Sequence, residues 1–396
     1  MPLLDLPPEL LTLIAQHIGP IELRTSTAYL LVSKPWYRAA LPVFLSELQL
    51  STLCLCSRHL EPPPIPNSPV GTLLAAEVKR LSIRLVGHPS EKVALRPWHD
   101  EEPSDDEARN QEEDHEICED WNIKGPQELE SRGWRDRYDW ENEMELRLRP
   151  WSDRINMGLT SISSMPPDFK SLEELSIEAR SQYGATWGPR RDYLSYTSIR
   201  SMIANIPPSL SNLTLDTCGS NLVLPGERVD AAASHICPLI AQQMHQVQNV
   251  RLRMRCICPF ILDSSPASSG QKSRLRTLVI RLSLPSYPEA AYEEHNDETR
   301  YDAQACTPNV MRKPLYKAMV TAGFKMARTN PEVQMLRVSY RDPIYSGINL
   351  VLADCVRRVY MYEPSEIFSH EDEGKEWDAW EHSETLQDGG AWSDLY

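Results

Sequence analysis

Histidine and cysteine side chains, the usual ligands of zinc, gather in one stretch of the sequence. Within 24 residues it holds His235, Cys237, His245, Cys256 and Cys258. Zinc sites usually place two to four residues between paired cysteines. Here Cys256 and Cys258 are separated by one residue, as are Cys54 and Cys56. Because this spacing is poor for zinc, we expect these side chains to be half-buried packing residues, without a metal or other cofactor.

The sequence lacks the short motifs of common catalytic sites. It has no GxGxxG or GxxxxGK[ST] phosphate loop and no GxSxG nucleophile elbow. Nine cysteines and ten histidines make some chance pairing in space common, so they do not indicate a nucleophile. We therefore predict that the protein is not an enzyme. The alternative is a site built from loops at strand ends, which would need a concave pocket with convergent titratable groups.

A six-residue pattern recurs along most of the chain and predicts the elements that would position any functional residue. It runs apolar, two variable residues, apolar, one variable residue, apolar, and its last two apolar positions alternate as on one face of a strand. It occurs at Leu45/Leu48/Leu50, Val78/Leu81/Ile83, Leu172/Leu175/Ile177, Leu210/Leu213/Leu215, Val247/Val250/Leu252, Leu275/Leu278/Ile280, Val333/Leu336/Val338 and Val356/Val359/Met361. Five of the seven intervals lie within the roughly 20–50 residues typical of repeat proteins.

Helical patterns lie between these units. We predict helices over residues 198–205, 231–245 (with Pro238 inside) and 314–328. Strands alternating with helices favour a parallel sheet, and stacking in one direction would give a solenoid. The predicted fold class is therefore α/β, with strands on one face and helices on the other.

The formal net charge of -15 is concentrated in two segments. Residues 99–120 carry a net charge of -11 and residues 363–396 carry -10, which leaves +6 for the rest. We expect both acidic segments to be disordered and solvated, and the acidity argues against nucleic acid as a partner. Eight of the ten tryptophans lie in the insertion 88–160 or in the tail. Such aromatic residues indicate contacts, and we expect these segments to pack back onto the positive body.

The compartment and the membrane relationship also follow from composition. Asp5 and Glu9 stand where a secretory signal would carry basic residues, and no apolar run reaches the ~18 residues of a membrane span. Nine scattered cysteines suit reduced thiols. We expect a cytoplasmic or nuclear protein that does not bind membranes.

The first 45 residues predict a small helical unit. Leu10, Leu13, Ile14 and Ile18 recur at helical spacing, and Gly19-Pro20 ends the helix. A second apolar cluster spans residues 28–32 and is followed by Trp36. Because proline breaks helices, we expect Pro35 to end or kink the helix that carries it. The predicted domains are 1–45, a repeat domain 46–362 with the acidic insertion 88–160, and an acidic tail 363–396.

Two motifs in this unit resemble those of an F-box. Leu6-Pro7-Pro8-Glu9-Leu10-Leu11, with Ile14 and Ile18 after it, resembles the opening helix of that family. Val32-Ser33-Lys34-Pro35-Trp36-Tyr37 resembles its closing motif. Leu41-Pro42-Val43-Phe44-Leu45 is similar to the lead into the first strand of F-box proteins with leucine-rich repeats. The units that follow resemble an irregular leucine-rich-repeat array, although they lack its fixed asparagine or cysteine.

The resemblance implies a substrate-recognition adaptor of an SCF-type ubiquitin ligase, in which the F-box binds the Skp-type adaptor of a cullin-RING ligase. The repeat array would bind an unknown protein substrate. The residues expected to contact the Skp-type adaptor are Leu6, Pro7, Pro8, Glu9, Leu10, Ile14, Ile18, Val32 and Trp36. The alternative is an interaction scaffold whose degenerate F-box helices only cap the first repeat of the solenoid.

Overall fold

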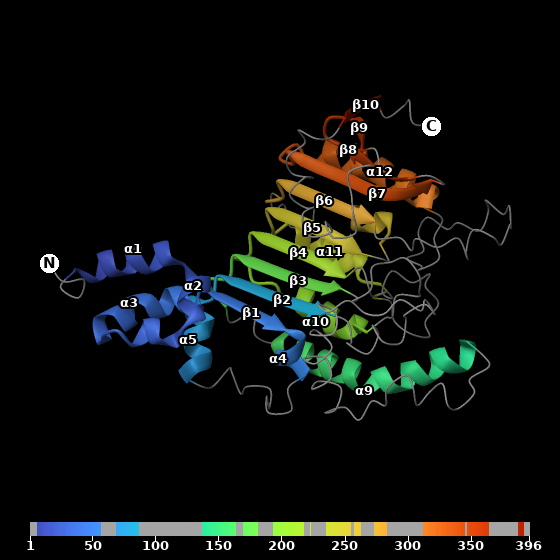
Figure 1. The fold of residues 1–396 in the computed structure, drawn as a ribbon. Coiled ribbons are helices and arrows are strands. Elements are labelled where there is room, and N and C mark those ends of the chain that lie inside the picture. The colour runs from blue at the N-terminus through green and yellow to red at the C-terminus, as the bar shows by residue number, and fades with distance from the viewer. Residues whose placement is uncertain are drawn as a thin grey trace.

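The computed structural model is a mixed α/β protein, with helices at the N-terminus followed by one large sheet (Figure 1). It describes residues 6–56, 69–86, 137–163, 169–180, 193–217, 222, 235–254, 257–262, 273–282, 312–344, 347–363 and 387–391. The sheet has ten strands, and neighbours in the sequence are neighbours in the sheet throughout. The predicted α/β class with a mainly parallel sheet is confirmed at this level.

Residues 6–45 form a unit that we call the helical module. It consists of α1 (Pro8–Ile18), α2 (Pro20–Thr25), the 3-10 helix η2 (Thr27–Leu31) and α3 (Lys34–Leu45). Pro8 begins α1, where a missing N–H costs nothing. The helix ends at Gly19, whose φ of 85° favours glycine and whose N–H donates to the carbonyl of Ala15. The predicted short helices are therefore confirmed.

Pro35 does not break a helix, so that prediction was wrong. The residue lies in the first turn of α3, directly after Lys34 begins it. Ser33 is the N-cap, and its hydroxyl accepts a hydrogen bond of 3.2 Å from the N–H of Trp36. Because the first N–H groups of a helix have no carbonyl partner within it, proline there removes no bond. The helix then continues through Pro42 to Leu45.

Seven strands run parallel in sequence order. They are β1 (Glu47–Ser51), β2 (Arg80–Val86), β3 (Glu174–Arg180), β4 (Asn212–Thr217), β5 (Asn249–Met254), β6 (Thr277–Leu282) and β7 (Met335–Ile344). The repeat pattern sets their register: Leu48, Leu81, Leu175, Leu213, Val250, Leu278 and Leu336 lie side by side across the sheet. The second and third apolar positions of the first seven predicted units therefore lie in strands that are paired in register.

The eighth predicted unit is not a further parallel strand. The sheet continues with β8 (Gly347–Asp354), β9 (Val359–Glu363) and β10 (Gln387–Ala391), and β7 to β10 pair antiparallel. Met361 of β9 pairs with Leu352 of the preceding strand, and Val356 is exposed in the turn between them. A spacing of four residues between β8 and β9 leaves no room for a crossover, which needs a dozen or more.

Helices pack on the apolar face of the sheet. The described ones after the module are α4 (Thr52–Cys56), α5 (Pro69–Glu77), α9 (Arg137–Ser163), α10 (Tyr196–Ala204), α11 (Cys237–Met244), η5 (Pro259–Ile261) and α12 (Arg312–Thr329). The predicted helices near residues 198 and 314 are confirmed as α10 and α12. The helix predicted from residue 231 begins only at Cys237, and Pro238 therefore lies in its first turn rather than in its middle.

Neither acidic segment is disordered throughout, contrary to the prediction: Gln387–Ala391 of the tail form β10, and part of the insertion 88–160 is helical. The last part of the insertion forms α9, from which Trp151, Ile155 and Leu159 are buried in the core of the sheet domain. The Trp151 and Tyr193 rings lie 5.2 Å apart. This tryptophan therefore packs back onto the body as expected. Residues 88–136 of the insertion and residues 364–386 and 392–396 of the tail lie outside the described residues, and with them Trp98, Trp121, Trp134, Trp377, Trp380 and Trp392.

Two separate hydrophobic cores hold the described structure together. One lies between the sheet and its helices and includes the aligned strand residues. The other lies within the helical module and is formed by Leu11, Ala15, Leu23, Leu30, Trp36, Ala39, Ala40 and Val43. In the part of the chain that is described, no helix combines the length and apolar character needed to cross a membrane.

Candidate protein-interaction surface on the helical module

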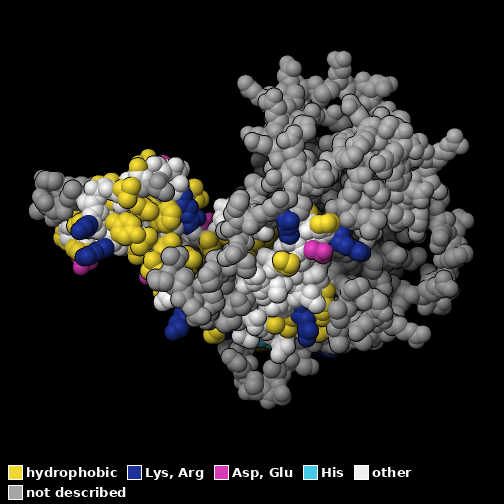
Figure 2. Space-filling view, turned by 90° about the horizontal axis from the view of Figure 1, so that it is seen from below, with side chains coloured by type: hydrophobic (Ala, Val, Ile, Leu, Met, Phe, Trp, Pro, Cys, Tyr) yellow, Lys and Arg dark blue, Asp and Glu magenta, His cyan; other side chains and the backbone are white. Residues whose placement is uncertain are grey.

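Exposed hydrophobic side chains concentrate on the helical module. Of the eleven large hydrophobic residues that are exposed in the described structure, eight lie between residues 10 and 37. They are Leu10, Leu13, Ile18, Ile21, Tyr29, Leu31, Val32 and Tyr37, and we call them the apolar surface. Figure 2 shows hydrophobic side chains gathered over the module, at the left of the view. Clustered apolar exposure of this kind is typical of an interaction site.

Helix α1 supplies one part of the apolar surface. Leu11 and Ala15, one helical turn apart, are fully buried against α3 and the rest of the module core. Leu10 and Leu13 lie on the neighbouring side of the helix and remain exposed. The helix is thus apolar over an arc wider than the module can cover, because a unit of this size buries only one face of each helix.

The segment between η2 and α3 supplies the other part. Leu30 is buried and Leu31 is 78% exposed, so of these two consecutive apolar residues one faces the module core and the other faces solvent. Trp36 is only 4% exposed, and its indole N–H donates a 2.5 Å hydrogen bond to the carbonyl of Tyr29. This bond ties η2 to α3 and so fixes the backbone that presents Leu31 and Val32.

The structure separates the residues predicted for adaptor contact into three groups. Pro7, Pro8, Glu9, Leu10, Ile18 and Val32 are exposed. Leu6 and Ile14 are partly buried and pack against the module core. Trp36 belongs to that core and is only 4% exposed. Its burial favours a role in positioning the exposed residues, while its contact with the Skp-type adaptor stays a prediction.

Five exposed residues of the apolar surface were missing from the predicted contacts: Leu13, Ile21, Tyr29, Leu31 and Tyr37. The sequence carried a signal for two of them. Leu13 recurs with the other apolar residues of α1, and Leu31 lies in the second apolar cluster. Periodicity marks both as apolar face residues, but only packing distinguishes the side that meets the module core from the side that meets solvent.

Arg24 of α2 and Phe44 of α3 pack together inside the helical module, beside its junction with β1. The guanidinium of Arg24 donates a 2.8 Å hydrogen bond to the carbonyl of Phe44 and lies 5.5 Å from the centre of its ring. Burial lowers the pKa of Arg24, and the charge of Glu47 opposes that shift. A hollow of about 410 Å³ opens here between the module and β1, lined by Arg24, Phe44, Leu45, Glu47, Leu48, Gln49, Ser51 and Leu74.

Charged residues on the polar face of the sheet are paired across strands. Arg84 of β2 lies 3.9 Å from Glu178 of β3. On the next two strands Asp216 and Arg253 form a buried ion pair. Arg337 of β7 lies 3.6 Å from Asp354 of β8, and burial lowers the pKa of Arg337 against the opposing influence of that carboxylate. These pairs link neighbouring strands and therefore serve first to hold the sheet together.

The structure brings together three of the residues that the sequence offered as zinc ligands. His235, Cys237 and Cys258 are all buried, and their ligand atoms lie within 4.8 Å of one another. All three are buried, whereas we had expected half-buried side chains. His245 caps the opposite end of α11, where burial lowers its pKa, and Cys256 lies outside the described residues.

Comparisons with known proteins supply no relative. No protein-family model matches the chain, and no similar curated protein or solved structure was found.

Proposed function

We propose that the protein is a non-catalytic adaptor of an SCF-type ubiquitin ligase whose helical module binds the Skp-type adaptor subunit. The observation that carries this proposal is the apolar surface, because it lies in the residues whose motifs resemble an F-box. Leu10 and Ile18 belong to the first motif, and Val32 begins the second. Two stretches that are separate in the sequence thus supply one module with exposed hydrophobic side chains.

The energetics favour a protein partner for this surface. Burying one aliphatic side chain of this size is worth about 1.5–3 kcal/mol. Six exposed aliphatic residues and two exposed tyrosines on one 40-residue unit therefore provide a large driving force for association. Helix-in-groove recognition covers such surfaces by placing residues of successive helical turns in a hydrophobic groove.

The second part of the proposal concerns the sheet domain, which we propose to be an irregular leucine-rich-repeat-like solenoid that binds the substrate. Its support is the regular register of β1 to β7, in which each repeat unit places its second and third apolar residues beside those of the next. Such an array presents a long continuous surface to a ligand. The chemistry of the substrate does not follow from this arrangement.

The alternative is that the helical module only caps the first repeat. A cap shares its core with the array that it covers. Here the module has its own core, formed by residues that are not part of the core beneath the sheet. The large apolar surface would also remain uncovered in a cap. Both observations favour partner binding.

The test is binding of the full chain to a purified Skp-type adaptor, measured by pull-down and by titration. In the variant, Leu10→Asp is combined with Val32→Asp, since both side chains are exposed and their loss leaves the module core intact. Placing two charges in an apolar contact should weaken binding at least about 100-fold. Met157→Asp is the matched control, because Met157 is a 67% exposed apolar residue on α9, outside the module.

Circular dichroism accompanies each variant to show that it is folded. Binding by the wild type and by Met157→Asp, with loss in the folded double variant, supports the proposal. Wild-type protein that does not bind the adaptor would refute it. Equal binding by the double variant would show that another surface is used.

A further inference from the structure

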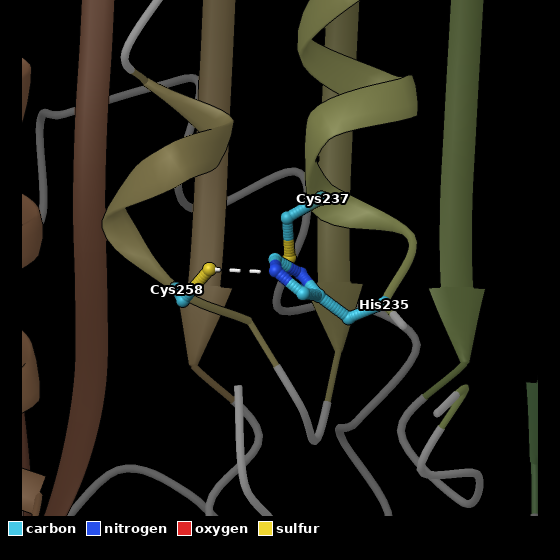
Figure 3. Close-up of side chains that lie close together, drawn as sticks. All are labelled: His235, Cys237 and Cys258. Carbon is cyan, nitrogen blue, oxygen red and sulfur yellow. Dashed lines mark hydrogen bonds between the residues drawn. The ribbon is translucent and has the colours of Figure 1, made fainter. Parts of the chain in front are cut away.

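Three potential metal ligands from two successive repeat units meet in one buried place (Figure 3). His235 directs its ring toward the sulfur atoms of Cys237 and Cys258, and Nδ1 of the ring lies 3.8 Å from Sγ of Cys258. All three residues are at most 3% exposed. Among the described residues, this is the one group of histidine, cysteine and acidic side chains whose ligand atoms are close enough to share an ion.

The fold brings these residues together because β4 and β5 are parallel neighbours. His235 and Cys237 lie on the connection that leads from the carboxyl end of β4 into α11, and Cys237 is the first residue of that helix. Cys258 follows the carboxyl end of β5 and precedes η5. Parallel strands end at the same edge of a sheet, so the two connections meet there.

The separations suit a tetrahedral zinc ion. With Zn–S bonds of about 2.3 Å and Zn–N bonds of about 2.0–2.1 Å, neighbouring ligand atoms lie about 3.5–3.8 Å apart. The 3.8 Å between Nδ1 and Sγ lies at the upper end of that range, and no pair exceeds 4.8 Å. Small side-chain rotations would therefore be enough to close the site around an ion.

The ligand types select zinc. Two thiolates and an imidazole are poor ligands for Mg²⁺ and Ca²⁺, which prefer oxygen, whereas both types suit Zn²⁺. A thiolate at Cys237 also lies at the positive end of the α11 dipole. Without a metal, the two cysteines would be buried packing residues around the ring.

We propose that Zn²⁺ binds to Nδ1 of His235 and to the sulfur atoms of Cys237 and Cys258, with a water or another added donor in the fourth position. Binding would displace the two thiol protons to solvent, so affinity should fall as the pH is lowered. The ion would join the connections that follow β4 and β5 and so hold α11 against the next repeat unit. This role is independent of the helical module and of adaptor binding.

The test uses the full chain, purified and kept reduced. Zinc content is measured by elemental mass spectrometry after dialysis, and Co²⁺ is titrated while thiolate-to-cobalt absorption is recorded. Wild type should retain about one ion per chain. Cys237→Ser, Cys258→Ser and His235→Gln should each lower affinity at least about tenfold. Cys355→Ser and His245→Gln are the controls, since these buried or half-buried residues lie outside the group, and both should bind as wild type does.

A second measurement on the wild type covers the case in which a variant fails to fold. Zinc should slow alkylation of Cys237 and Cys258, as read by peptide mass spectrometry, and leave the buried Cys355 unchanged. Adding a chelator should reverse the effect. A folded wild-type chain that retains no zinc, or binding that survives in a Cys237→Ser/Cys258→Ser double variant, would overturn the proposal.

Discussion

Asp216 and Arg253 illustrate how single residues on the polar face of the sheet affect stability. Arg253 donates from Nε to Oδ1 of Asp216 at 2.8 Å and from Nη2 to Oδ2, which makes a two-point contact between β4 and β5. Both side chains are almost fully buried. Burial of two charges is costly, and only their close pairing offsets that cost. Each partner is therefore needed mainly because the other is present.

Replacing Arg253 by Met should destabilise the protein by about 3–5 kcal/mol, because the carboxylate of Asp216 would remain buried without its cation. The double variant Arg253→Met/Asp216→Asn should recover part of that loss, since no charge is left. Urea unfolding followed by circular dichroism measures both effects. The matched control is Arg80→Met, which removes an exposed cross-strand pair with Glu174 and should cost less than about 1 kcal/mol. Equal losses at the two sites would contradict this account.

Helix α12 shows how closely an element must approach the sheet. A Cβ atom on Gly323 would lie 2.6 Å from Sγ of Cys355 and 3.1 Å from Cδ2 of Leu336. The helix therefore depends on a glycine for its contact with β7 and with the turn after β8. Burial, with the nearby Asp354, raises the pKa of the Cys355 thiol, which therefore stays neutral as a packing residue should.

The variant Gly323→Ala should destabilise the protein by about 1–3 kcal/mol from overpacking, although alanine favours helices by up to about 1 kcal/mol. Adding Cys355→Ala should restore much of the loss, because it removes the sulfur atom that the new methyl group meets. Thermal unfolding compares the single and double variants. Thr321→Ala, at an exposed position of the same helix, is the control and should be nearly neutral. A stabilised Gly323→Ala variant would show that the helix can move away from the sheet.

At the scale of the whole molecule, the two cores define two units of stability. The helical module and the sheet domain meet where α3 ends and β1 begins, but their buried residues form separate clusters. A protein built in this way can lose the structure of one unit while the other stays folded. The cap alternative requires the opposite behaviour, because a cap and its array would share one core.

Leu11→Ala tests this at the centre of the module core, where the side chain is fully buried and its loss should cost about 2–5 kcal/mol. In hydrogen exchange, peptides from residues 6–45 should lose protection, while those from β4 to β6 keep theirs. Leu215→Ala, in the core beneath the sheet, should instead reduce protection in β4 to β6 and leave residues 6–45 protected. Joint loss of protection in both regions after Leu11→Ala would favour the cap.

The sequence by itself determined the local elements and the order of the sheet. The apolar pattern of the repeat units sets which strand residues face the helices, and it does so locally because strand residues alternate in direction. The helical spacing of apolar residues likewise determined α1, α10 and α12 locally. The pattern failed at Val356/Val359/Met361, since it does not encode the direction of a strand, which here follows from the short connection after β8.

Only the tertiary structure decided which residues are exposed to a partner and which potential metal ligands lie together. In the helical module it placed Trp36 inside and Leu31 outside, although both are apolar, because packing of α1, η2 and α3 determines the inner side. It brought His235 and Cys237 to Cys258 from the next repeat unit, whereas spacing along the chain had argued against a metal. Contacts between residues of different repeat units depend on how the strands pair. The spacing of residues within one unit therefore cannot predict them.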